Sequence, residues 1–98
     1  MNDKNHYIKE IENQQARWHQ DIYKFRIITE DIGEKDPDRQ IKYYQIIEDI
    51  VAKEKDVADM LSELKESSDT EWQQIKTEIE NLKERVTNSI ESARSTVN

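Results

Sequence analysis

Apolar residues recur at alternating steps of three and four positions through the first third of the chain. The series consists of Ile8, Ile11, Gln15, Trp18, Ile22, Phe25, Thr29 and Ile32, with polar residues at two of its eight positions. This spacing places all eight side chains on one face of an α-helix and matches a heptad repeat. We therefore predict a helix over about residues 4–32, with Asp3 as its N-cap and Gly33 as a left-handed C-cap.

A second heptad series follows a short polar segment that holds the only glycine and the only proline of the chain. This segment predicts a loop at 33–37, with Asp36 as N-cap and Pro37 favoured at the first helical position. We expect the second helix over about residues 38–66. Its heptad positions are Gln40, Tyr43, Ile47, Ile50, Glu54, Val57, Leu61 and Leu64, and the stripe is broadened by Ile41, Tyr44, Ile46, Val51 and Met60.

The two series align when the second helix folds back on the first. If the numbers of facing residues add up to 72, Phe25 lies opposite Ile47, and Trp18 lies opposite Glu54. Each residue of one heptad class then meets a residue of the other class, as antiparallel packing requires. Because the loop length, the turn residues and both heptads agree, the sequence predicts an antiparallel helical hairpin.

A third series continues toward the end of the chain, and the segment before it leaves two alternatives open. The series consists of Trp72, Ile75, Ile79, Leu82, Val86, Ile90, Ala93 and Val97. Ser68 followed by Glu71 matches a capping box, which predicts a break near Ser67–Thr70 and a separate third helix over about 69–96. The alternative is one very long second helix that absorbs an eleven-residue stutter, since no glycine or proline forces a break there.

The predicted fold class is therefore all-α, a single helical domain over residues 1–98. A break gives a slender coiled-coil three-helix bundle, whereas a continuous helix gives a two-helix hairpin whose last apolar stripe stays uncovered. In either case the helix-packing seam consists of Ile8, Ile11, Trp18, Ile22, Phe25, Ile32, Tyr43, Ile47, Ile50, Val57, Leu61, Leu64, Trp72, Ile75, Ile79, Leu82, Val86 and Ile90.

Composition limits how thick this seam can be. Charged residues make up 38% of the 98 residues and hydrophobic residues 34%, whereas an average domain has about 25% charged residues. Such a chain fills a thin apolar seam rather than a thick globular core. The net charge of −7 and the lack of a basic stripe argue against nucleic acid as a partner and make a membrane an unfavourable one.

The residue types that carry chemistry are scarce or isolated. The chain has no cysteine, and its two histidines are His6 and His19. Asp3 and His6 have the spacing of a di-iron ligand pair, but a second acid–histidine pair is missing. No serine lies in a nucleophile elbow, and Gly33 alone cannot form a phosphate loop. We therefore predict no metal, no cofactor, no small-molecule substrate and no enzymatic activity.

Targeting signals are not evident in the sequence. The start Met1–Lys4 lacks a basic region followed by an apolar one, and no apolar run approaches 18 residues. These features predict neither a signal peptide nor a transmembrane span. The absence of cysteine fits a reducing compartment, so we expect a cytoplasmic protein.

Three segments of the chain carry a resemblance to a known family. They are the run Leu64–Lys76, the stretch from Tyr7 to Trp18, and the Lys42–Tyr43–Tyr44 opening of the second predicted helix. Together they resemble a family of small bacterial coiled-coil proteins of about this length, some of them labelled stress-response proteins. The resemblance implies an all-helical protein without catalytic residues and suggests a role in stress response.

The function that follows is non-enzymatic and based on helix–helix association, with a second copy or with another helical protein. The alternative is an amphipathic protein associated with a lipid surface or with the cell envelope. Trp18 and Trp72 are expected to lie in the core, with a partner-binding role as the alternative. The polar seam residues Gln15, Thr29 and Glu54 are expected to fix the helix register at some cost in stability.

Overall fold

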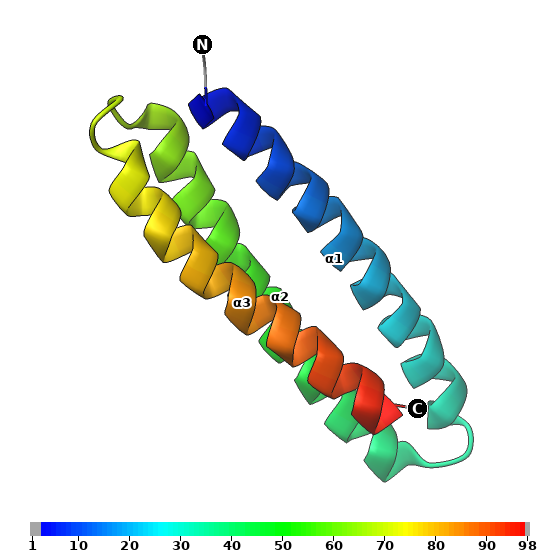
Figure 1. Cartoon of the computed structure of the whole chain (residues 1–98). Helices are drawn as coiled ribbons and strands as arrows, with labels where there is room; N and C mark the ends of the chain where they lie inside the picture. The colour runs from blue at the N-terminus through cyan, green and yellow to red at the C-terminus, as the bar shows by residue number, and fades with distance from the viewer. Residues whose placement is uncertain (1–2, 98) are drawn as a thin grey trace.

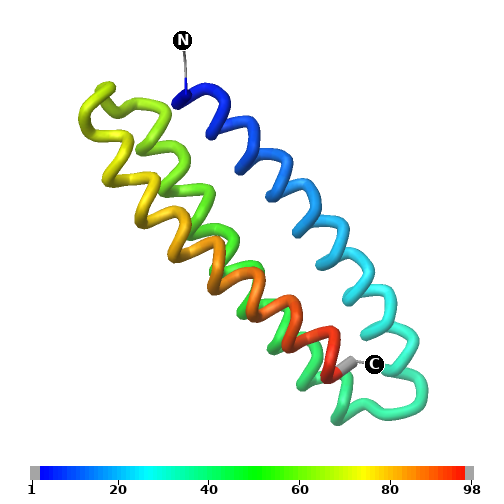
Figure 2. Tube along the Cα trace, in the orientation of Figure 1, coloured from blue at the N-terminus to red at the C-terminus, as the bar shows by residue number. Residues whose placement is uncertain are grey.

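The computed structural model describes residues 3–97, and within that range the chain is helical without any strand. Helix α1 spans Asp3–Gly33, α2 spans Pro37–Glu66 and α3 spans Trp72–Val97. Figure 1 shows that α2 runs antiparallel to both neighbours in a bundle that measures 54 × 19 × 17 Å. The predicted all-α three-helix bundle is confirmed. The alternative of one very long second helix is wrong, because the chain reverses between α2 and α3 (Figure 2).

Cross-helix hydrogen bonds give the register of α1 against α2. Lys4 Nζ donates to the backbone carbonyl of Ser67 at 2.6 Å, and His19 Nε2 lies 2.5 Å from Glu54 Oε1. The residue numbers of these pairs add up to 71 and 73, and those of the other hydrogen-bonded pairs add up to 69 for Lys4 with Lys65 and for Gln40 with Thr29, and to 77 for Lys65 with Glu12. These sums scatter around the predicted 72.

The start of α2 is capped as its sequence predicts. The Asp36 carboxylate accepts a hydrogen bond from the backbone N–H of Arg39 at 3.2 Å, and Pro37 is the first helical residue. Because proline lacks an N–H, it leaves no unpaired donor at this position. The prediction for α1 is wrong: Asp3 is already helical and is not the N-cap.

Gly33 has a different role from the one predicted. It is the last residue of α1 and does not have a positive φ, so the left-handed C-cap is wrong. A Cβ at Gly33 would collide with the side-chain amide of Gln40, which donates to the backbone carbonyl of Thr29 at 3.3 Å. A side chain at position 33 would therefore displace the Gln40 amide from its hydrogen bond to Thr29, whereas the backbone at Gly33 has no positive φ that requires glycine.

The second reversal depends on Ser68. Its hydroxyl accepts from the backbone N–H of Glu71 at 3.3 Å and donates to the Glu71 carboxylate at 3.0 Å. The N–H of Trp72 then bonds to the Ser68 carbonyl at 3.1 Å. Residues 69–71 form a turn, so α3 begins at Trp72 instead of the predicted residue 69.

The core is one apolar stripe on each helix. Fourteen of the eighteen predicted seam residues are buried, and the half-buried ones are Ile8, Ile32, Ile75 and Leu82. Ile41 does not broaden the stripe, since its side chain is 58% exposed. Ala93 is also buried, and the side chain of Val97 lies outside the described part.

The three helix pairs are not equivalent. α2 packs closely against both α1 and α3, whereas α1 and α3 approach each other less closely. α2 therefore connects the other two helices. Within residues 3–97, no helix combines the length and the apolar character needed to cross a membrane.

Replacement of Trp18 by alanine tests this core. Trp18 is only 1% exposed, so Trp18→Ala should lower the free energy of unfolding by about 3–5 kcal/mol. Tyr23, on the same helix and 65% exposed, provides the control, and Tyr23→Ala should change it by less than about 0.5 kcal/mol. Urea denaturation followed by circular dichroism measures both values. Similar losses for the two variants would contradict the packing described.

Candidate interaction surface

Polar side chains bridge the edge between α1 and α3. The Tyr7 hydroxyl donates to Glu80 at 2.6 Å, and Arg94 donates to Asp21 at 3.1 Å. The residue numbers differ by 73 in both pairs, so the two helices run parallel with a constant offset. Because long polar side chains make these contacts, α1 and α3 stay connected without close packing of their backbones.

An aromatic cluster lies at the N-terminal ends of α1 and α3. The rings of Tyr7 and Trp72 are 6.3 Å apart between centroids, and Lys76 Nζ lies 5.1 Å from the centroid of the Tyr7 ring. Burial, together with the hydrogen bond to Glu80 and the negative charges of Glu80 and Glu10, raises the pKa of the Tyr7 phenol above its ordinary value. Tyr7 is therefore a neutral hydrogen-bond donor, which is a structural rather than a nucleophilic role.

Each polar seam residue has a distinct environment. Thr29 is fully buried, and its hydroxyl donates to the backbone carbonyl of Phe25 at 2.6 Å within the same helix. The Glu54 side chain is 12% exposed and pairs with His19. His19 follows Trp18, the residue that the predicted register places opposite Glu54. Gln15 is half-buried. Two of the three polar seam residues therefore have a hydrogen-bond partner: the helix backbone for Thr29 and a surface histidine for Glu54.

The other candidate ligand residues lie apart from one another. His6 pairs with Glu10 at 3.1 Å on the exposed surface of α1. Within residues 3–97, no three side chains of the histidine, cysteine, aspartate and glutamate types come together in a way that would hold a metal ion.

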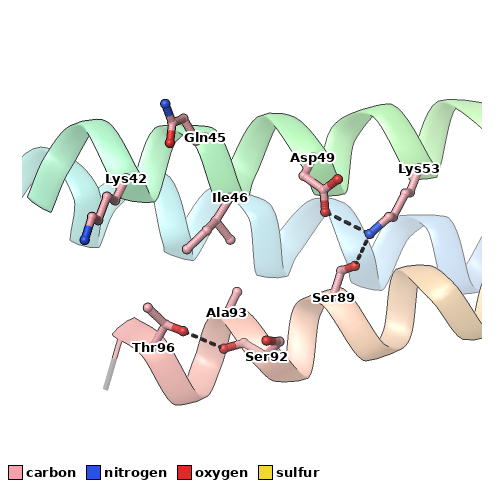
Figure 3. Close-up of a pocket in the computed structure, with 9 residues that line it drawn as sticks. All are labelled: Lys42, Gln45, Ile46, Asp49, Lys53, Ser89, Ser92, Ala93 and Thr96. Atoms are coloured by element: carbon pink, nitrogen blue, oxygen red, sulfur yellow. Dashed lines mark hydrogen bonds and ion pairs between the residues drawn. The ribbon is translucent and has the colours of Figure 1, made fainter.

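A groove of about 630 Å³ runs between α2 and the C-terminal half of α3 (Figure 3). Ile46 and Ala93 point toward each other across it. Lys53 Nζ donates to Asp49 at 2.8 Å and to the Ser89 hydroxyl at 2.7 Å, which ties the two walls together. The walls consist of Lys42, Gln45, Ile46, Asp49 and Lys53 from α2, and Ser89, Ser92, Ala93 and Thr96 from α3.

Small side chains on α3 create this groove. Ser89 lies seven residues after Leu82 and fourteen after Ile75, so it occupies the same position of the heptad as these larger residues. The change from isoleucine and leucine to serine removes bulk from the wall that faces α2. A groove with two helical walls, an apolar floor and polar edges is a shape into which a further helix fits.

Sequence reasoning missed both the groove and the burial of Tyr7. The predicted third series follows the apolar residues and takes a step of four from Val86 to Ile90, where a step of three leads to Ser89. That irregular step is the signal for the groove, because it marks where small polar residues replace apolar ones along the wall. Tyr7 was passed over because the heptad selects its neighbour Ile8.

No family model, curated protein or solved structure matches the chain. The function therefore has to be inferred from its own residues.

The raised pKa of Tyr7 predicts a specific loss of stability at alkaline pH. An unfolded tyrosine ionises near pH 10 and the folded one only at higher pH, so above about pH 10 the unfolded state gains stability relative to the folded state. Denaturation of the wild type and of Tyr7→Phe between pH 8 and about 11 measures this effect. The free energy of unfolding should fall more steeply with pH in the wild type.

At neutral pH, Tyr7→Phe should lose about 1 kcal/mol because the bond to Glu80 is absent. Parallel pH profiles for the two proteins would show that folding does not raise the pKa of the Tyr7 phenol.

Proposed function

We propose that this chain is a non-enzymatic helical protein that acts through association of helices, with a second copy or with another helical protein. The observation that supports the proposal is the groove of about 630 Å³ between α2 and α3, with the half-buried Ile46 and the small residues Ser89 and Ala93 along it. We further propose that the interaction is of the coiled-coil type and that the protein acts in a bacterial stress response in the cytoplasm. The sequence resemblance supports the role in stress response.

The limited core gives association a physical reason. Each helix buries a single stripe, and several apolar residues of the α2–α3 face are only partly covered, among them Met60, Ile75 and Leu82. A small domain with so thin a core has a modest free energy of folding. Coverage of this face by another helix removes more apolar surface from water and stabilises the folded chain.

The two tryptophans are already used inside the bundle. Trp18 is 1% exposed and Trp72 is 7% exposed, so neither is free to anchor a partner without unfolding of the bundle. A partner is therefore expected at the α2–α3 face rather than at the tryptophans.

The lipid-surface alternative takes second place for a reason of charge. Asp56, Glu63 and Glu78 are exposed on α2 and α3, near the partly covered apolar residues. Anionic lipids favour lysine and arginine beside an apolar face, so acidic flanks weaken such binding.

Sedimentation of the full chain and cross-linking in the native host test the proposal together. A photo-reactive amino acid is placed at Ser92, on the groove, or at the exposed Tyr23 on α1 as a control. We expect either a mass that rises with concentration or covalent capture of a helical protein at position 92 and not at position 23. A chain that stays monomeric throughout and gives no adduct specific to position 92 would refute association at this face.

A further inference from the structure

The turn between α2 and α3 contains no residue that excludes a helix. The five residues after Glu66 are Ser, Ser, Asp, Thr and Glu, without glycine or proline. Within residues 3–97 no backbone φ is positive, so the reversal does not need a left-handed residue. It starts at Ser67, whose φ of −77° and ψ of 158° depart from helical values mainly in ψ. A change at few backbone torsions therefore separates this turn from a helix.

The turn also leaves backbone donors without a partner in the protein. Among the described residues, no backbone carbonyl accepts from the amide N–H of Ser68, Asp69 or Thr70, and all three residues are exposed. In a helix each of these N–H groups would bond to the carbonyl four residues earlier. Helix formation across the turn therefore adds backbone hydrogen bonds, and it breaks in exchange the cap that Ser68 forms with Glu71.

The apolar stripes of α2 and α3 stay on one face if the turn becomes helical. Trp72 follows Leu61 by eleven residues, and Ile75 follows Leu64 by eleven. Eleven residues make almost three whole turns of an α-helix, so the two members of each pair lie on the same side. A helix that continued through the turn would therefore carry one unbroken apolar stripe from α2 into α3.

In a single chain, α3 is held in place by the side chains that it buries. Its Trp72, Ile79 and Val86 lie in the core, and the helix packs closely against α2. A straight hinge within one isolated chain would expose these side chains to water, which explains why the chain reverses (Figure 2). A second copy presents the same surface of α1 and α2, so it can bury them equally well.

We propose that two copies of this chain exchange their third helices; the inference rests on the association with a second copy proposed above. In the exchanged dimer residues 67–71, the hinge, are helical, and α3 of each copy packs against α1 and α2 of the other. Contacts that lie within one chain, such as those of Tyr7 with Trp72 and with Glu80, then join the two copies. The exchanged dimer needs no new interface, because it uses the contacts that the single chain already makes.

The register of α2 against α3 sets the two-fold axis inside the hinge. The residue numbers add up to 139 for Tyr43 with Thr96 and to 142 for Lys53 with Ser89. If this register holds between two straightened helices, each residue faces the one with which its number adds up to about 140. Thr70 then faces Thr70 of the second copy. The axis therefore crosses the middle of the hinge, and α2 of each copy pairs with the exchanged α3.

Protein concentration decides between the two forms. They share the core and the hairpin of α1 and α2, and they differ in the hinge and in the freedom lost when two chains associate. The sequence of the hinge therefore sets the concentration at which dimers form. Each dimer contains two hinges, so a substitution there acts twice.

Cross-linking of cysteine pairs distinguishes an exchanged dimer from a dimer of closed chains, because the chain has no native cysteine. Asp21→Cys with Arg94→Cys joins α1 to α3 where the native side chains are 3.1 Å apart, and His19→Cys with Glu54→Cys joins α1 to α2. A short bismaleimide is added to each variant after the full chain has been refolded at low or at high concentration. We expect covalent dimers from the first pair at high concentration, and cross-links within one chain from the second pair.

Proline in the hinge tests the straightening itself. Asp69→Pro suits the turn, since Asp69 follows the capping Ser68 and its N–H has no backbone partner among the described residues. In the exchanged dimer the same proline lies inside a helix, so the dimer dissociation constant should rise at least roughly a hundredfold. Asp69→Ala removes the same carboxylate but allows a helix, so its dimer should be at least as stable as that of the wild type. Circular dichroism shows whether each variant keeps the helical fold.

Sedimentation equilibrium together with the cross-linked products separates the possible failures. Exchange is overturned, while self-association stands, if the wild type dimerises but the α1–α3 pair cross-links only within single chains. The same holds if Asp69→Pro dimerises as tightly as Asp69→Ala. A monomeric wild type that captures a different helical protein at Ser92 overturns the exchange and leaves the proposed function intact. A chain that stays monomeric and captures nothing contradicts both.

Discussion

Burial of α2 on two sides is the contact on which the whole bundle depends. Its Ile50, Val57 and Leu64 are fully buried, and the helix packs closely against both α1 and α3. Since only 34% of the residues are hydrophobic, each helix can supply one apolar stripe, and a middle helix must share its stripe with two neighbours. At the α1–α3 edge, where the backbones approach less closely, long side chains make the contact, as in the bridge between Arg94 and Asp21 and in the packing of Tyr7 against Trp72.

The hairpin was predictable from sequence because independent local signals agreed there. Two heptads fix the facing stripes, and Asp36 with Pro37 fixes where α2 starts. The role of Gly33 was not predictable in the same way. A glycine just after a periodic series predicts a positive φ, and only the folded backbone shows that Gly33 does not have one and that the Gln40 amide lies beside it instead. Whether the helix breaks after α2 also could not be decided from sequence. The capping residues permit a turn there, and it is the burial of the α3 stripe against α2 in the folded bundle that favours the break over a continuous helix.

The groove was harder to predict than the fold because it forms where α3 lacks large side chains. A search for periodic apolar residues finds Ile90 and passes over Ser89, although the serine lies on the wall of the groove. It also selects Ile8 where Tyr7 is the more deeply buried residue. In a three-helix bundle each stripe must contact two neighbours and is wider than a two-helix heptad implies, so adjacent positions compete for burial.

The acidic composition determines how such a face can be used. Copies with a net charge of −7 repel one another at long range, so contact requires that their few basic residues lie opposite acidic ones. Lys42 and Lys53 lie beside the groove, and no residue of α1 lines it. The chain therefore does not fill this groove with its own first helix. The same decrease in side-chain size along α3 that opens the groove leaves Ile46 only half-buried beside it, so a further helix in the groove would remove this side chain from water.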